Sequence, residues 1–294
     1  MAAPKPEQKK KSDLVTRTIT GLIFGGVVAA CIVWNLYSLM ALMGIVMVLS
    51  LREFYTITKR HRVDSKVKGW YLPLVTLVAA GIYLAAFADS YGYLEEHGPH
   101  INLLLLVPGI FLFFFVLELF SQAKEPFRNI GHHMLAFAYL VFPFTLLAYL
   151  THSVDGTYDW RPVLGIVFLI WANDSSAYLV GRTLGKTKLF PRISPGKTIE
   201  GSVGGVVGCA IVAIGLFYLI PVNGWEMYDW VVVAILASTF ATFGDLVESM
   251  LKRNLGIKDS GTMLPGHGGI LDRFDAFYFT IPLVVAYLAM RGLI

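Results

Sequence analysis

The chain has 294 residues, of which 56% are hydrophobic and 15% are charged, and its formal net charge at pH 7 is +4. A soluble domain is typically about 45–50% apolar and about 25% charged, so this composition excludes one water-soluble globular core. We therefore expect a polytopic membrane protein.

The first 16 residues are polar and basic, and they predict a disordered tail. Apolar segments of about the 20-residue length that crosses a bilayer follow this tail. The sequence predicts nine of them, at about 17–35, 36–57, 70–88, 101–120, 131–151, 161–181, 200–221, 228–251 and 274–292. Helix-compatible spacing throughout, with no credible strand, predicts an all-α fold. Five helices form an N-terminal region (17–151), and four helices with two long polar loops form a C-terminal region (152–294).

The distribution of lysine and arginine predicts the orientation in the membrane. If the N-terminus is cytoplasmic, every Lys and Arg except Arg161 and Arg291 falls in the tail or in the loops of the cytoplasmic side. The loops of the other side are acidic instead. We therefore expect the C-terminus outside and a basic cytoplasmic face, which would attract anionic lipid headgroups and nucleotides.

Small residues inside the apolar segments predict close helix packing. Gly201-x-x-x-Gly205 and Gly204-x-x-x-Gly208 favour packing inside the molecule over dimerisation. Cys31 and Cys209 both lie in apolar runs, which indicates small buried side chains and neither a disulfide nor a metal site.

Charged side chains within or at the ends of spanning helices are costly, so each is a candidate functional residue. Asn173 and Asp174 lie in the sixth segment, with Tyr178 one turn after Asp174 on the same face. Glu118, near the inner end of the fourth segment, is ambiguous and stays unassigned.

The eighth and ninth segments contribute acidic residues that could meet. Asp272 and Asp275 are spaced i, i+3 and share a helix face, and Asp245 lies in the last turns of the preceding helix. Three converging carboxylates predict a site of hard oxygen ligands for Mg²⁺. The alternatives are pairing with nearby Lys and Arg, and stabilisation of a helix N-terminus. For Glu248 we expect pairing with Lys252 at i, i+4.

The loop between the sixth and seventh segments contains Gly196-Lys197-Thr198, which is similar to the end of a Walker loop. That reading fails, because Pro191 stands where the first glycine is required and no strand is predicted before it. Ser194 or Thr198 is instead predicted to cap the seventh helix, whose N-terminus with Lys197 would form an anion site.

The stretch 249–275 is the most charge-dense and glycine-rich part of the chain, and apolar runs flank it on both sides. Charges of both signs around a Gly-rich bend are what a site for phosphates and a metal needs. His267, within this bend, has no second His or Cys nearby, so zinc is not expected. It could donate a hydrogen bond to a phosphate or shape the turn.

The pattern Ser249-x-x-Lys252-Arg253-x4-Lys258-Asp259, followed by Pro265-Gly266-His267-Gly268-Gly269-x-x-Asp272-Arg273-x-Asp275, resembles the signature of the phosphatidate cytidylyltransferases, the CDP-diacylglycerol synthases. The loop Ser194-Pro195-x-Lys197-Thr198-x-Glu200-Gly201 resembles that family's second motif. The resemblance covers residues from about 165 to 290, and no motif position departs from it. The first 150 or so residues match only in hydropathy.

This resemblance implies an enzyme that transfers the cytidylyl group of CTP to phosphatidic acid, giving CDP-diacylglycerol and pyrophosphate for phospholipid biosynthesis. It implies Mg²⁺, in a metal centre that can be paired with a second cation and has Asp245 and Asp272 as ligands, and we add Asp275. It also implies a homodimer in a bacterial-type inner membrane, with the site facing the cytoplasm, membrane lipids around it and no nucleic-acid partner. The expected catalytic residues are Lys197, Lys252, Arg253, Lys258, Asp259, His267 and Arg273. The expected substrate-binding residues are Asp174, Ser194, Pro195, Thr198, Glu200, Gly268 and Gly269.

Other functions remain open at this stage. A CTP-dependent enzyme acting on another lipid, such as a polyprenol kinase or an ether-lipid cytidylyltransferase, would share the phosphate chemistry. An anion transporter, with Asp174 and Glu118 as coupling residues, predicts inverted repeats and a polar site at the membrane midplane. The polar motifs here crowd the expected cytoplasmic edge instead.

Overall fold

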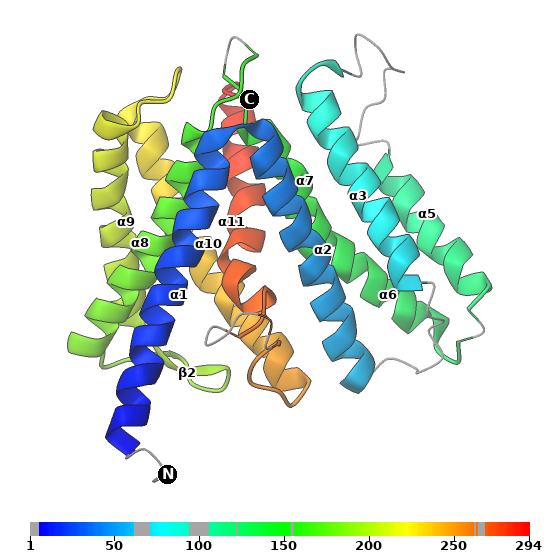
Figure 1. Ribbon diagram of the computed structural model, residues 1–294, viewed down its shortest axis with the longest axis horizontal. Coiled ribbons are helices and arrows are strands. Elements are labelled where there is room, and N and C mark those ends of the chain that lie inside the picture. The colour runs from blue at the N-terminus through cyan, green and yellow to red at the C-terminus, as the bar shows by residue number, and fades with distance from the viewer. Residues whose placement is uncertain are drawn as a thin grey trace.

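The structure, a computed structural model, describes residues 6–61, 71–93, 106–121, 123–153, 156–261, 263 and 268–294. Long helices run up and down beside one another in a bundle, which confirms the all-α prediction (Figure 1). The two ends of the chain lie at opposite ends of the bundle. The β-hairpin and the segment that follows α10 lie at the same end as the N-terminus, so the two polar motifs share one end of the molecule (Figure 1).

The N-terminal half supplies the first five predicted segments. They correspond to α1 (Pro6–Trp34), α2 (Leu36–His61), α3 (Tyr71–Ser90), α5 (Leu106–Leu119), and α6 (Pro126–Ala136) with its continuations η2 (Phe137–Val141), α7 (Phe142–Leu146) and η3 (Leu147–Leu150). Helix α1 begins inside the stretch for which the sequence predicts a disordered tail. The fifth segment changes to a π-helical turn at η2, a local irregularity that is common at functional sites.

The C-terminal half supplies the other four segments as α8 (Arg161–Thr183), α9 (Ile199–Leu219), α10 (Met227–Asn254) and α11 (Leu271–Met290). Between α8 and α9 the chain forms a small antiparallel hairpin of β1 (Lys188–Phe190) and β2 (Ser194–Thr198). The sequence reading of no strand was wrong at this point. Strands this short, in a polar segment with proline and glycine, leave no alternating pattern to detect.

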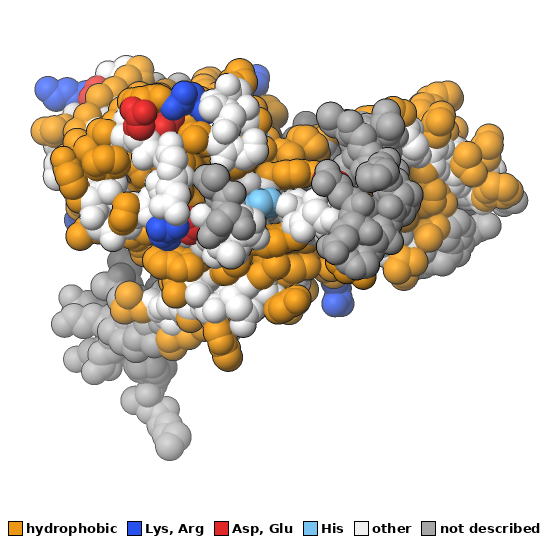
Figure 2. All heavy atoms as spheres, turned by 90° about the horizontal axis from the view of Figure 1, so that it is seen from above, with side chains coloured by type: hydrophobic (Ala, Val, Ile, Leu, Met, Phe, Trp, Pro, Cys, Tyr) orange, Lys and Arg blue, Asp and Glu red, His pale blue; other side chains and the backbone are white. Residues whose placement is uncertain are grey.

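Seven described helices are long and apolar enough to cross a membrane. Two shorter apolar helices, Thr20–Trp34 and Pro108–Leu119, coincide with the predicted first and fourth segments. Large apolar side chains such as Leu77 and Ile211 are exposed on the outer faces, and orange side chains follow much of the outline in Figure 2. Water-soluble proteins rarely expose so much contiguous apolar surface, so the chain is a multi-pass membrane protein.

The glycines of α9 allow it to lie directly against α8. A Cβ at Gly204 would be 2.5 Å from the Val180 side chain, and one at Gly208 would be 2.0 Å from the Ser176 hydroxyl. The predicted use of these glycines in internal packing is confirmed. Cys209, also on α9, is free and buried, as expected.

At the end of the bundle away from the motifs, an ion pair joins α10 to α11. Asp229 is fully buried and accepts hydrogen bonds from Arg291 Nε (2.9 Å) and the Tyr287 hydroxyl (2.6 Å). Its other oxygen accepts from the backbone N–H of Glu226 at the start of α10 (2.8 Å). A buried carboxylate is stable only with such partners, so this contact fixes the helix pair at its far end.

Candidate active site

Three carboxylates converge where α10 and α11 pack together. Oxygens of Asp245, Glu248 and Asp275 all lie within 4.8 Å of one another. Asp245 and Glu248 share a face of α10, and Asp275 lies in the second turn of α11. Gly244 allows this approach, because a Cβ there would be 2.3 Å from the Asp275 carbonyl oxygen. The close helix contact therefore brings the three acidic side chains together.

The donor set of this cluster fits a hard divalent cation. All its donors are carboxylate oxygens, which Mg²⁺ prefers, and three such groups repel one another unless a positive charge lies among them. Glu248 is buried, and its one charged partner among the described residues is Lys252, whose Nζ lies 2.5 Å from Glu248 Oε2. The sequence predicted Asp245 and Asp275 as metal ligands, and Glu248 only as a partner of Lys252. The i, i+3 spacing of Asp245 and Glu248 was the sequence signal that Glu248 belongs to the carboxylate cluster.

Asp272 lies beside this cluster, and its carboxylate is bound by the protein itself. Its Oδ1 accepts from Lys252 Nζ at 2.6 Å. Its Oδ2 accepts from the backbone N–H of Ser260 (3.1 Å) and of Gly269 (3.0 Å), and the Ser260 hydroxyl lies 3.0 Å away. Asp272 thus joins Ser260, in the segment after α10, to Gly269, just before α11.

Lys252 bridges Asp272 and the carboxylate cluster. Its Nζ lies 2.5 Å from Glu248 Oε2 as well as 2.6 Å from Asp272 Oδ1. The predicted i, i+4 pair of Glu248 and Lys252 is confirmed. The ammonium is mostly buried, at 13% side-chain exposure, so both ion pairs are shielded from water.

The second motif reaches the cluster through Lys197. Its Nζ lies 2.5 Å from Asp245 Oδ2 and donates to the Thr242 carbonyl at 3.4 Å. Lys197 stands at the end of β2, and the next residue, Thr198, caps α9 by accepting a hydrogen bond from Gly201 N. The predicted capping of this helix is confirmed, with Thr198 as the capping residue. The hairpin therefore places a cation and a helix N-terminus next to the carboxylates.

Further predicted residues surround this centre. Asp174 is exposed on α8, close enough to Asp245, Lys197 and Arg273 for direct Coulomb interaction. Glu200 accepts hydrogen bonds from the backbone N–H groups of residues 186 and 187, so its carboxylate shapes the turn before β1.

The remaining predicted residues lie on β2 or on the signature loop. Ser194 and Pro195 belong to β2, and Lys258 and Asp259 are exposed after α10. Arg253, in the last turn of α10, donates to the Ile257 carbonyl. Gly268 has a φ of +84°, a conformation that favours glycine. Gly269 donates its N–H to Asp272. His267 lies outside the described residues.

Two residues that contact this region went unnoticed in the sequence. Glu53, on α2, accepts hydrogen bonds from the Ser260 hydroxyl and from Leu271 N. An acidic residue inside a predicted spanning segment was a usable signal for it. Tyr139, on η2, has a buried hydroxyl without a hydrogen bond among the described residues, and it interacts electrostatically with Asp275 and Glu248. No sequence feature separates it from an ordinary core tyrosine.

Glu118, which the sequence left unassigned, belongs to a separate buried polar cluster. Its carboxylate accepts from the Ser121 hydroxyl (2.6 Å) and Asn129 Nδ2 (3.4 Å), and lies 3.5 Å from His133 Nε2. The other ring nitrogen of His133 lies 2.7 Å from the Tyr55 hydroxyl on α2. This cluster joins α5 and α6 to α2.

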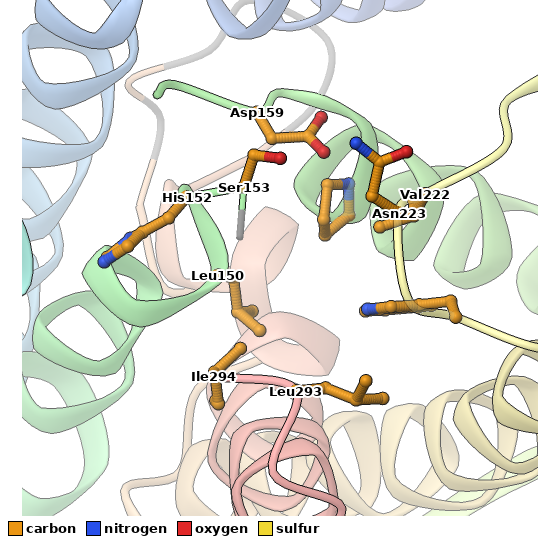
Figure 3. A pocket seen from close by; sticks show the side chains of 10 residues that line it. Leu150, His152, Ser153, Asp159, Val222, Asn223, Leu293 and Ile294 are labelled. Carbon is orange, nitrogen blue, oxygen red and sulfur yellow. The ribbon is translucent and has the colours of Figure 1, made fainter. Parts of the chain in front are cut away.

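A small cavity lies at the opposite end of the bundle, between the segments that lead into α8 and α10 and the C-terminus (Figure 3). His152, Asp159, Asn223 and Leu293 are among its lining residues. Its volume is about 10 Å³, room for about one water molecule, so a nucleotide or lipid cannot bind there. Burial lowers the pKa of His152 below its usual value.

Comparison with known proteins gives consistent results. The family model described as cytidylyltransferase family matches residues 15–291. A phosphatidate cytidylyltransferase of Staphylococcus aureus (strain COL) is 40% identical over 196 residues, which cover 65% of this chain and 72% of that protein. One from Staphylococcus haemolyticus (strain JCSC1435) is 35% identical over 240 residues, 73% of this chain and 92% of that protein.

Proposed function

Because the chain belongs to the cytidylyltransferase family, we propose that it transfers the cytidylyl group of CTP to phosphatidic acid, giving CDP-diacylglycerol and pyrophosphate for phospholipid biosynthesis. The observation that carries this proposal is a family match over residues 15–291, together with relatives named for this reaction. The convergence of both polar motifs on one carboxylate cluster supports the proposal that the reaction takes place there.

The cytidylyltransferase family generally requires a divalent cation. We propose that it is Mg²⁺, held by Asp245, Glu248 and Asp275, with Asp174 near enough to Asp245 to serve a second cation. A bound divalent cation supplies Lewis-acid stabilisation of charge on phosphoryl oxygens. The sequence assigned metal binding to Asp272, and the surrounding donors favour a supporting role for it.

For this reaction the protein needs mainly to position the two substrates and to neutralise the negative charge of their phosphates. The phosphate monoester of phosphatidic acid is already largely ionised near neutral pH, so no general base is needed to activate it. Its oxygen attacks the α-phosphorus of CTP in line; the new O–P bond forms as the bond to the β-phosphate oxygen breaks, and pyrophosphate leaves. Lys197, Lys252 and Arg273 neutralise the triphosphate and the lipid phosphate while this charge builds up.

The location of the site suits one substrate dissolved in the bilayer and another dissolved in water. The motifs lie at the end of the bundle where α1 begins, and the Lys and Arg distribution supports a cytoplasmic position for that end. We propose a cytoplasmic-facing site in a bacterial inner membrane. We also propose that the chain forms a homodimer, on the basis of analogy with the family alone.

The test is to incubate purified protein in detergent with labelled CTP, phosphatidic acid and Mg²⁺. We expect CDP-diacylglycerol and pyrophosphate in equal amounts, and neither product with the Asp275→Asn variant. A phosphorylated lipid with free CDP would indicate a kinase instead. Absence of any CTP-derived lipid from folded protein would overturn the proposal.

A further inference from the structure

A buried glutamate on α2 contacts the segment between α10 and α11 at Ser260 and the start of α11 at Leu271. Glu53 is 5% exposed. Its Oε1 accepts from the Ser260 hydroxyl at 2.8 Å, and its Oε2 accepts from the backbone N–H of Leu271, the first residue of α11, at 3.0 Å. A carboxylate that accepts from the first turn of a helix also interacts favourably with the helix dipole. One side chain from the N-terminal half thus contacts Ser260, six residues after the end of α10, and the residue at which α11 starts.

The loop is shaped around this carboxylate. A Cβ at Gly261 would lie 2.1 Å from Glu53 Oε1, and one at Gly269 would lie 1.8 Å from the same atom. Neither glycine has a positive φ, so the backbone conformation does not require glycine at these two positions. Glycine is needed there because the Glu53 carboxylate occupies the space that a side chain would take.

The contact continues from Glu53 to the carboxylate cluster. The Ser260 hydroxyl that faces Glu53 also lies 3.0 Å from Asp272 Oδ2. Asp272 binds Lys252, and Lys252 binds Glu248, a member of the cluster. Removing Glu53 therefore loosens the anchor of Asp272 and, through it, the position of Lys252.

Helix α2 is also held from another side. Tyr55 is two residues from Glu53, and side chains so spaced point to roughly opposite sides of a helix. Its hydroxyl lies 2.7 Å from His133 Nδ1, in the polar cluster that contains Glu118. The α2 backbone that carries Glu53 is thus itself fixed to α6.

We propose that Glu53 is a positioning residue for the active site. It keeps Ser260, Gly261 and residues 268–271 in the conformation in which Asp272 and Lys252 support the carboxylate cluster. This inference rests on the function proposed above for that cluster. It also gives the N-terminal helices a role in the reaction.

The test compares Glu53→Ala and Glu53→Gln with a matched buried carboxylate, Asp229→Asn, at the other end of the bundle. A merely structural role predicts that all three lower the thermal midpoint and leave the activity of the folded enzyme unchanged. Our proposal predicts that Glu53→Ala lowers kcat/KM about a hundredfold and raises the Mg²⁺ concentration for half-maximal rate, because two hydrogen bonds to a charged group are lost. Glu53→Gln keeps the shape and an acceptor for Leu271 N, so we expect a loss of only about tenfold.

A second readout does not depend on activity. Amide hydrogen exchange at Ser260, Gly269 and Leu271 should speed up in both Glu53 variants and stay unchanged in Asp229→Asn. If the wild type makes no CDP-lipid, the proposed function fails while exchange still decides the positioning role. If Glu53→Ala does not fold, Glu53→Gln decides it. The inference would be overturned by a folded Glu53 variant whose kcat/KM, Mg²⁺ dependence and amide exchange rates all equal those of the wild type.

Discussion

Lys197 Nζ lies 2.5 Å from Asp245 Oδ2, and this contact joins the β1–β2 hairpin to α10. The two residues belong to separate polar motifs, with the whole of α9 between them in the chain. The contact places the ammonium where it neutralises a metal-binding carboxylate or reaches a phosphate next to it. It is also only partly shielded, since the side chains are 24% and 40% exposed.

Because this ion pair is partly exposed, replacing Lys197 should affect catalysis much more than the stability of the fold. Partly exposed ion pairs contribute about 0–1 kcal/mol, so Lys197→Gln should change the thermal midpoint little. Loss of a cation that stabilises developing phosphate charge should lower kcat about a hundredfold or more. Lys197→Arg, which keeps the charge, serves as the control and should retain more activity. A large fall in the thermal midpoint of Lys197→Gln, or an unchanged kcat, would contradict a catalytic role for Lys197.

Asp275 and Asp272 should respond differently to replacement by asparagine. For Asp275→Asn we expect loss of turnover, because the variant lacks a proposed metal ligand. The fold should be retained, because the change removes one charge from a cluster of like charges. Mg²⁺ or Mn²⁺ should raise the thermal midpoint of the wild type, because a ligand that binds only the folded state stabilises it. That rise should shrink or vanish in Asp275→Asn. An unchanged metal-induced rise would remove Asp275 from the ligand set.

Asp272→Asn should cost both stability and activity. The resemblance implied a metal-ligand role for Asp272. The structure shows that Asp272 is one of two carboxylate partners of the mostly buried Lys252, with Glu248 as the other. Breaking a buried pair by removing one member costs about 3–5 kcal/mol, and the remaining pair with Glu248 should hold the loss to the lower end of that range. We therefore expect a lower thermal midpoint than for Asp275→Asn at equal expression. The double variant Asp272→Asn with Lys252→Met should recover little of that loss, because it leaves the buried Glu248 carboxylate without its cation.

The helices were predictable because each spanning segment carries its own signal of length and hydropathy. All nine predicted segments correspond to helices, two of them shorter than a full span among the described residues. The acidic and basic residues near α10 were also readable, since local spacing puts Asp245 and Glu248 on one helix face. The contact between Glu53 and the Ser260–Leu271 loop joins segments more than two hundred positions apart, and no local pattern encodes it.

Asp229 and Arg291 give a test of stability that is independent of the active site. Arg291→Met leaves the fully buried Asp229 carboxylate without its cation, so the thermal midpoint should fall. The kcat and the Mg²⁺ dependence of the folded enzyme should stay at wild-type values, because α10 and α11 are joined here at the end away from the carboxylate cluster. A changed Mg²⁺ dependence would show that the two ends of the helix pair are coupled.

Gly261 and Glu53 should show strong energetic coupling. Gly261→Ala alone introduces a Cβ 2.1 Å from Glu53 Oε1, and overpacking of this kind costs about 1–3 kcal/mol. Glu53→Ala alone leaves a cavity and unpaired donors. In the double variant the added methyl group enters the space that Glu53 vacates, so the combined loss should be smaller than the sum by about 1–2 kcal/mol.

Gly81→Ala on α3 is the matched control for this cycle. A Cβ at Gly81 has nothing within 4 Å, so the substitution should be neutral or slightly stabilising in a helix and should add independently to Glu53→Ala. Free energies of unfolding from denaturant titration in mixed micelles measure both cycles. Additive losses for Gly261 and Glu53 would mean that the carboxylate does not occupy the space beside this glycine. The positioning role of Glu53 would then lose its steric basis.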